Sequence, residues 1–189
     1  MAKPSPIQRL QSYWVYGGTT AGIALLLLTP LVAAGWATSA LLTYLCLPAY
    51  MLHQFEEHDD DRFRIFINSV LGKGRTALSV SDVYWINVLG VWVVLSLAIW
   101  ATVRIDLGWS AMAAYSLLVN AVAHIGQAVA MRRKNPGVIT ACLVFVPLSI
   151  SLLVISPASW LQHLVSFLCI ATLHAAIVLR VRVNLSRAP

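Results

Sequence analysis

The chain has 189 residues, of which 59% are hydrophobic and 11% are charged, and its mean hydropathy is +0.78. Soluble domains carry about 25% charged residues, so this composition excludes an ordinary soluble domain and places the chain among membrane proteins. The formal net charge of +6 could indicate nucleic acid, but the basic residues follow membrane topology, and we expect no nucleic-acid partner.

Apolar runs of nearly 20 residues recur along the chain and predict a single polytopic membrane domain over residues 1–189. The predicted fold class is all-α, an integral membrane bundle of six transmembrane helices. Ser81 and Asp82 are expected to cap the third helix. The six helices are expected to cover about residues 14–35, 37–57, 82–102, 109–131, 137–155 and 160–179.

A shorter amphipathic stretch lies between the second and third predicted helices. Three aspartates, at residues 59–61, precede it, and acidic residues suit a helix N-terminus. From about 61 to 71, apolar residues alternate loosely with arginine and asparagine. This pattern predicts an interfacial helix that lies in the membrane surface.

The basic residues divide unequally between the two sides that six spans would create. Six spans place both termini on one side, and all of the 13 Lys and Arg residues except Arg104 fall on that side. The positive-inside rule therefore predicts that the N and C termini are cytoplasmic. We expect the bacterial inner membrane or an equivalent membrane, with the polar chemistry facing the cytoplasm.

A dense polar cluster, His53-Gln54-Phe55-Glu56-Glu57-His58, ends the second predicted helix. His53, Glu56 and Glu57 stand at i, i+3 and i+4, so they share one helix face. A carboxylate buried in hydrocarbon without a partner costs several kcal/mol. The cluster is therefore either solvated among headgroups or paired inside the protein. His58 is rotated away from His53 and adjoins three aspartates, so we expect it to be solvated.

Two further histidines lie at a similar depth. At 1.5 Å per residue, His124 is roughly 12 Å inside the basic end of the fourth helix, and His174 is roughly 9 Å inside the end of the sixth. His163 lies at the opposite end of the sixth helix and is excluded. Helices two, four and six thus each bring a histidine to the inner leaflet.

Imidazole and carboxylate groups on neighbouring helices are ligands for zinc, iron or manganese. Glu56 or Glu57 would act as the catalytic general base, and one of the two would be a ligand. A histidine such as His174 could equally form a hydrogen bond with a neighbouring carbonyl group. We predict a divalent metal ion, with zinc preferred and iron second, bound by His53, Glu57, His124 and His174.

Three amides stand where they could support these ligands. Asn120 and Gln127 share the helix face of His124, at i−4 and i+3, and suit hydrogen bonds to a metal-bound imidazole. Asn87 lies about one turn inside the third helix. It could join this supporting set, although a helix–helix hydrogen bond is its simpler role.

The motif His53-Gln54-Phe55-Glu56-Glu57, followed by Asn120-Ala121-Val122-Ala123-His124 and the Pro136-Gly137 turn, resembles the HXXEE family of small integral membrane proteins. The resemblance covers most of the chain. That family is named for its motif and not for an established activity. The resemblance implies that the functional set is His53, Glu56, Glu57, Asn120 and His124, and it indicates no substrate.

The function favoured by these patterns is an intramembrane metal-dependent enzyme at the level of the cytoplasmic leaflet, acting on a lipid or lipophilic substrate by hydrolysis or another non-redox step. An iron-dependent oxygenase with the same ligands is an alternative, although the membrane desaturases and hydroxylases that it would resemble carry many more histidines. A transporter or a proton or metal pathway is a further alternative. The outer halves of helices two, four and six hold no carboxylate to continue such a path. The last alternative is a structural protein whose histidines pair only with other groups inside the protein.

Overall fold

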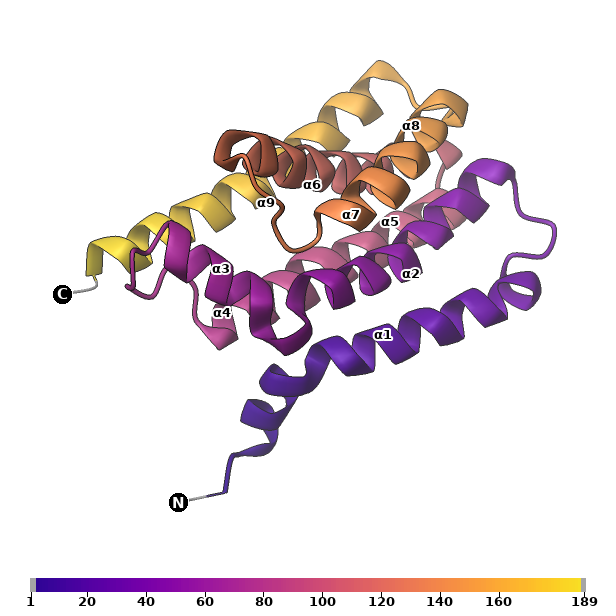
Figure 1. Cartoon of the computed structure of the whole chain (residues 1–189). Helices are drawn as coiled ribbons and strands as arrows, with labels where there is room; N and C mark the ends of the chain where they lie inside the picture. The colour runs from indigo at the N-terminus through magenta and orange to yellow at the C-terminus, as the bar shows by residue number, and fades with distance from the viewer. Residues whose placement is uncertain (1–2, 188–189) are drawn as a thin grey trace.

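The computed structural model describes residues 3–187, and over that range the chain is helical without β-strands. The start of α1, the end of α9, helix α3 and the α6–α7 connection lie at one end of the bundle (Figure 1). The α1–α2, α5–α6 and α8–α9 connections lie at the other. The elements are α1 (Pro6–Val32), α2 (Thr38–His58), η1 (Asp59–Asp61), α3 (Arg62–Val70), α4 (Val80–Trp85), η2 (Ile86–Val93), α5 (Val94–Arg104), η3 (Leu107–Trp109), α6 (Ser110–Met131), α7 (Val138–Thr140), η4 (Ala141–Phe145), α8 (Val146–Ile155) and α9 (Trp160–Arg187).

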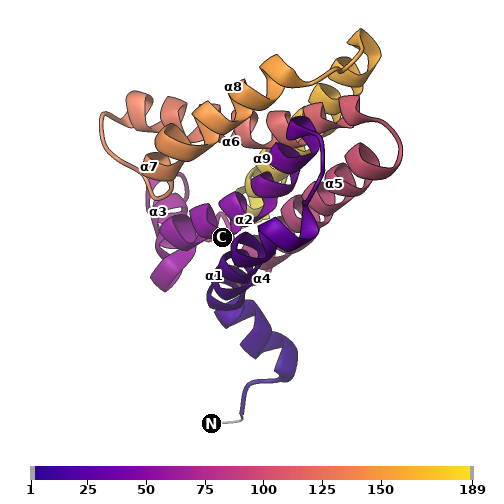
Figure 2. The ribbon, with the colours of Figure 1, turned by 90° about the vertical axis from the view of Figure 1, so that its right-hand side faces the viewer.

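Within residues 3–187, five helical stretches are long and apolar enough to cross a membrane by length and composition: Pro6–Val32, Val80–Arg104, Leu107–Met131, Val138–Ile155 and Trp160–Arg187. Helix α2 is not among them, because polar side chains lower its hydropathy. It lies inside the bundle, where α1, α5, α6 and α8 pack around it (Figure 2). Neighbouring helices therefore screen its polar groups. The six-span count and the cytoplasmic location of the termini stay predictions.

The outer surface of the bundle is apolar. Leu27, Leu31 and Val154 are between 76% and 79% exposed, and many other large apolar side chains on the outer helices are also exposed. Exposure of so much apolar surface to water is unfavourable. These helix faces fit a lipid bilayer as the environment of the protein.

The first and last helices are longer than the hydropathy pattern predicts. Helix α1 begins at Pro6 and not near residue 14, because Ser5 and Gln8 form a capping box with Pro6 at the first helical position. Helix α9 continues to Arg187 and not to residue 179. Its end is held on the start of α4, where Arg180 contacts Asp82 at 2.8 Å.

The cap of the third predicted helix was assigned to the wrong serine. Ser79 caps α4, and Asp82 closes a capping box with it: the backbone N–H of Asp82 donates to Ser79 Oγ at 3.1 Å, and the N–H of Ser79 donates to Asp82 Oδ2 at 3.0 Å. The capping box requires a side-chain acceptor three residues after the cap. Asp82 meets this requirement for Ser79 and not for Ser81.

Two π-helical segments interrupt the predicted helices, η2 after α4 and η4 before α8. Pro147 follows η4, and a proline cannot donate the hydrogen bond that an α-helix needs at this point. Such segments often occur at functional sites. Here η2 contains Asn87, and η4 directly follows Thr140.

Helix α3 lies within the range predicted for the interfacial helix, although its place in the membrane surface stays a prediction. Asp60 and Asp61 have φ values of 53° and 60°, and this left-handed pair reverses the chain directly after α2. The reversal returns α3 over the end of α2. Phe63 consequently lies against His58 and His124, with ring centroids 5.4 and 6.1 Å away.

Candidate metal centre

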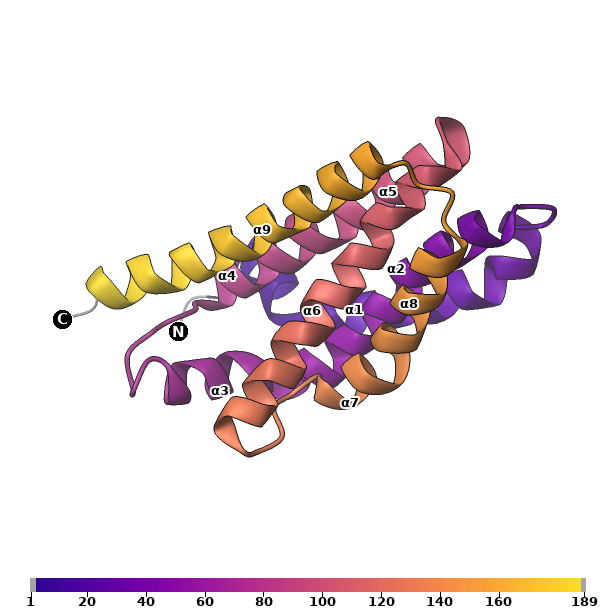
Figure 3. The same ribbon diagram turned by 90° about the horizontal axis from the view of Figure 1, so that it is seen from above.

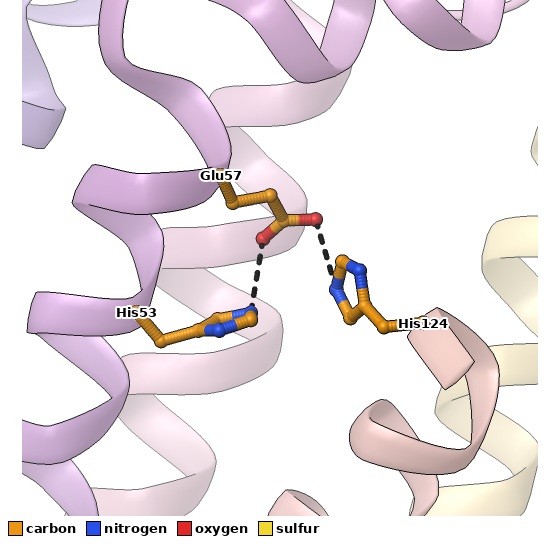
Figure 4. Close-up of side chains that lie close together, drawn as sticks. All are labelled: His53, Glu57 and His124. Atoms are coloured by element: carbon orange, nitrogen blue, oxygen red, sulfur yellow. Dashed lines mark ion pairs between the residues drawn. The ribbon is translucent and has the colours of Figure 1, made fainter. Parts of the chain in front are cut away.

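Three residues with metal-ligand chemistry meet at the buried end of α2 (Figure 4). His53 and Glu57 come from α2, and His124 comes from α6. Glu57 Oε2 is 3.5 Å from His53 Nε2, and Glu57 Oε1 is 3.4 Å from His124 Nε2. All three side chains are buried, and one ligand atom of each lies within 4.8 Å of the others. We call this group the His–Glu cluster.

The tautomer of His53 follows from its hydrogen bonds. The Glu56 carboxylate accepts hydrogen bonds from the hydroxyl and the backbone N–H of Thr140. Since the hydroxyl proton goes to Glu56, Thr140 Oγ1 accepts a hydrogen bond from His53 Nδ1–H, at 2.7 Å. The other ring nitrogen, Nε2, has no hydrogen-bond partner within residues 3–187, and in the neutral imidazole it carries a lone pair.

The Nδ1 atom of His124 is also held by a hydrogen bond, here to Asn135. The Asn135 side-chain amide donates to the backbone oxygen of His124 at 2.9 Å and to Gln127 Oε1 at 2.6 Å. Its remaining atom, Oδ1, is therefore an acceptor and takes a hydrogen bond from His124 Nδ1–H at 3.3 Å. In the neutral imidazole, His124 Nε2 consequently presents a lone pair to Glu57.

With both imidazoles neutral, the His–Glu cluster brings together three electron-pair donors with no proton between them. This arrangement is repulsive unless a cation lies among the donors. Two ligands bound to a tetrahedral ion at about 2.1 Å are roughly 3.4 Å apart. Glu57 approaches the two imidazoles at 3.4 and 3.5 Å through different oxygens, and with one atom from each residue the spacing is within 4.8 Å. The His–Glu cluster could therefore hold a metal ion.

His58 is buried, so the prediction that it is solvated was wrong. Its Nε2 lies 3.1 Å from Glu57 Oε2, and Asn87 Nδ2 lies 3.3 Å from the same nitrogen. The helical wheel places His58 away from His53, but the sequence alone does not show what covers that side. Trp14 of α1 and Phe63 of α3 cover it, with ring centroids 5.2 and 5.4 Å away.

Glu56 and Glu57, which the sequence left equivalent, have different surroundings. Glu57 belongs to the His–Glu cluster. Glu56 is directed toward α7, where it accepts the backbone N–H of Ile139 at 3.1 Å and of Thr140 at 2.7 Å. Glu56 therefore supports His53 through Thr140, and its expected role as a catalytic base is not supported by this geometry.

His174 is not brought into the cluster. It lies half-buried on α9, and its Nδ1–H donates to the backbone oxygen of Ile170 at 2.9 Å. The local hydrogen bond that was the alternative explanation for His174 is thus present. The depth argument fails here because it counts residues along a helix and does not give the direction of the side chain.

The three predicted supporting amides have three different environments. Gln127 acts through Asn135, as described above. Asn87 accepts a hydrogen bond from Gln54 at 2.8 Å and donates to the Val83 backbone oxygen at 2.9 Å, so the expected helix–helix hydrogen bond is present. Asn120 forms no side-chain hydrogen bond with a described residue, and its Oδ1 is a buried atom without a partner.

Sequence reasoning missed the contribution of the α6–α7 connection, which it treated as a turn. Asn135 and Thr140 hold the two imidazoles. Gly137 lies between them, and a Cβ atom at this position would be 2.8 Å from His124 Cε1 and 2.9 Å from His53 Cε1. The available signal was the Asn-Pro-Gly turn beside a helix that carries a buried histidine.

A cavity of about 420 Å³ adjoins the His–Glu cluster. Glu57, His58 and His124 form part of its wall, and the rest is mostly apolar side chains from α4, η2, α6 and α9. Helix α9 runs along one edge of the bundle, where it packs mainly against α6 (Figure 3). We call this space the α6–α9 cavity.

Replacement of Thr140 by valine tests the support of His53. Thr140→Val keeps the size of the side chain and removes the link from Glu56 to His53 Nδ1. We expect metal affinity to fall about 10- to 100-fold, as for other groups that orient a ligand histidine, with little change in thermal stability. Competition with a chromophoric chelator measures this affinity.

The matched control is Thr102→Val, because Thr102 is also buried and donates only to the Ala98 backbone oxygen of its own helix. Equal metal affinities in the two valine variants would contradict the role of Thr140.

Comparison with protein families gives one match. Residues 44–152 match a family described as "Protein of unknown function with HXXEE motif". The matched range contains the whole His–Glu cluster together with Asn135, Gly137 and Thr140, and it ends before α9. No curated protein and no solved structure matches the chain.

Proposed function

This chain belongs to the family of proteins with the HXXEE motif, and we propose that it is an intramembrane metal-dependent enzyme. The ion is held by His53, Glu57 and His124. Zinc is the preferred metal, and the reaction is hydrolysis, or another non-redox step, of a lipid or lipophilic substrate. The site lies at the level of the cytoplasmic leaflet.

The observation that carries this proposal is the orientation of two buried imidazoles. Each donates its Nδ1–H to a fixed acceptor, and each directs its free Nε2 at the same carboxylate. A buried ion pair of histidine and glutamate would need a proton on Nε2. The distances of 3.4 and 3.5 Å from Glu57 are long for such an ion pair, and two neutral imidazoles with one carboxylate are what a divalent cation requires.

The chemistry follows from the number of ligands. Catalytic zinc sites commonly have three protein ligands and keep the fourth position for water, whose pKa the ion lowers toward 7. Glu57 and His58 are in contact with each other and line the α6–α9 cavity. They are the groups best placed to take a proton from such a water. The apolar wall of the cavity favours a lipophilic substrate.

The same donor set supports a second candidate function. Two histidines and one carboxylate with open positions also form the ligand set of non-haem iron oxygenases. An iron-dependent oxygenase is therefore the alternative, and the identity of the bound metal decides between the two chemistries.

Elemental analysis of protein purified in detergent, without chelators, tests the proposal. We expect about one equivalent of zinc in the wild-type protein and none in His124→Ala. Stoichiometric iron would instead favour the oxygenase.

His163→Ala is the matched control, since His163 lies on α9 and contacts Tyr115 at 3.2 Å, away from the His–Glu cluster. It should retain the metal. A wild-type protein without metal, or a metal content that His124→Ala leaves unchanged, would refute the proposed site.

A further inference from the structure

Among the described residues, the wall of the α6–α9 cavity contains one fully buried polar atom without a hydrogen-bond partner, Asn120 Oδ1. Three other polar wall groups have partners: Ser116 donates to the Met112 backbone oxygen, Gln127 accepts from Asn135, and Asn87 accepts from Gln54. The carboxamide of Asn120 lines the cavity and forms no hydrogen bond with a described residue. An unpaired buried polar atom costs about 1–3 kcal/mol, so a bound partner for Asn120 is favoured.

The position of Asn120 relates this partner to the His–Glu cluster. Asn120 and His124 are four residues apart on α6, so they share a face about one helical turn, or roughly 6 Å, from each other. A ligand group that pairs with Asn120 would therefore lie beside the proposed metal ion.

A carboxamide both donates and accepts hydrogen bonds. Its full complement is another amide, which offers a carbonyl oxygen and an N–H group together. An ester offers the carbonyl oxygen alone, and a hydrocarbon offers neither. The chemistry of Asn120 therefore favours an amide as the polar group of the ligand.

The size and lining of the cavity define the rest of the ligand. The volume of about 420 Å³ lies within the roughly 300–1,000 Å³ of small-ligand pockets. A single acyl chain is a ligand of this size. Beyond Asn120 and His124, the wall contributed by α9 includes Ile170, Leu173 and Ile177, which suit an alkyl chain.

We infer that the α6–α9 cavity binds a single-chain fatty acyl amide whose amide group pairs with Asn120 beside His124. This inference rests on the proposed function for its chemistry. In the corresponding hydrolysis, a water oxygen bonds to the carbonyl carbon and the C–N bond breaks. A proton from water goes to the leaving nitrogen, so the products are a fatty acid and an amine.

Photocrosslinking of the purified full chain in detergent tests this inference. The probe is a fatty acid N-methylamide with a diazirine in its chain, and the competitors are N-methyldodecanamide, methyl dodecanoate and tridecane. We expect crosslinks on α6 and α9, and competition strongest for the amide and weakest for the hydrocarbon. Asn120→Leu should weaken competition by the amide about tenfold and leave tridecane unchanged.

Two phenylalanine substitutions on α6 control for the cavity itself. Ala123 lines the cavity, so Ala123→Phe should remove the crosslinks. Val129 is 72% exposed and is not part of the wall, so Val129→Phe should retain them. Crosslinks outside the cavity, or equal competition by the amide and the ester in the wild-type protein, would overturn the inference.

The same crosslinking on metal-free protein separates this inference from the proposed function. Selective amide binding by a protein that never contains metal would refute the metal-dependent function and leave the ligand assignment in place. A metal-loaded protein without amide preference would refute the ligand assignment alone.

Discussion

Glu57→Gln should abolish stoichiometric metal binding, because Glu57 is the one carboxylate that faces both imidazole Nε2 atoms. The substitution keeps the size of the side chain and removes the negative charge. Loss of one partner from a buried charged group costs about 3–5 kcal/mol, which corresponds to at least about a hundredfold in affinity. Chelator competition and elemental analysis measure the loss.

The neighbouring glutamate provides the comparison. Glu56→Gln changes the same functional group one residue earlier, where the carboxylate accepts hydrogen bonds from Ile139 and Thr140. It should retain stoichiometric metal with an affinity reduced no more than about 10- to 100-fold. A larger loss in Glu56→Gln than in Glu57→Gln would contradict the assignment of the ligand.

The double variant tests whether the ligands share one ion. Once Glu57→Gln or His124→Ala has removed the ion, the second substitution has little left to remove. Glu57→Gln/His124→Ala should therefore lose little more than either single variant, because the effects of residues that share a partner are not additive. Stoichiometric metal in either single variant would refute a shared site.

Gly137→Ala should impair metal binding although it adds only one methyl group. The new Cβ atom would lie 2.8 Å from His124 Cε1 and 2.9 Å from His53 Cε1, closer than real Cβ contacts. Both imidazoles are held at Nδ1, so they cannot move without loss of a hydrogen bond. The φ of Gly137, +92°, adds strain for any residue with a Cβ atom. We expect loss of metal together with a lower melting temperature.

Gly74→Ala separates the effect of backbone strain from the effect of the steric clash with the two imidazoles. Gly74 has nearly the same φ, +91°, but a Cβ atom there would meet nothing within 4 Å. Overpacking costs about 1–3 kcal/mol, so Gly137→Ala should be less stable than Gly74→Ala by roughly that amount. Gly74→Ala should retain its metal. Equal metal content and equal melting temperatures in the two variants would show that Gly137 is not packed against the imidazoles.

Several features of the protein follow from the sequence because they depend on neighbouring residues alone. The apolar runs predict the helices, and the i and i+4 spacing places His53 and Glu57 on one face. Helix α2 itself was predicted within one residue at each end, since apolar patterning and the short link to α1 fix it locally. The convergence of His124 with this face was inferred from depth, and the structure brings the three residues together.

The tertiary structure decided what lies around each side chain, because depth along a helix does not give the direction in which a residue faces its neighbours. It separated Glu57, among the imidazoles, from Glu56, which meets the N–H groups of α7. It turned His174 toward its own helix and enclosed His58 between α1 and α3.

The supporting residues were missed in the sequence for a related reason. Asn135, Gly137 and Thr140 are 11 or more residues from the nearest histidine that each contacts, and they read locally as a turn and a helix start. They reach the imidazoles only because the α6–α7 connection folds back over the end of α2. The sequence by itself thus determined which residues can bind a metal ion, and only packing between helices decided which of them meet and in which tautomer.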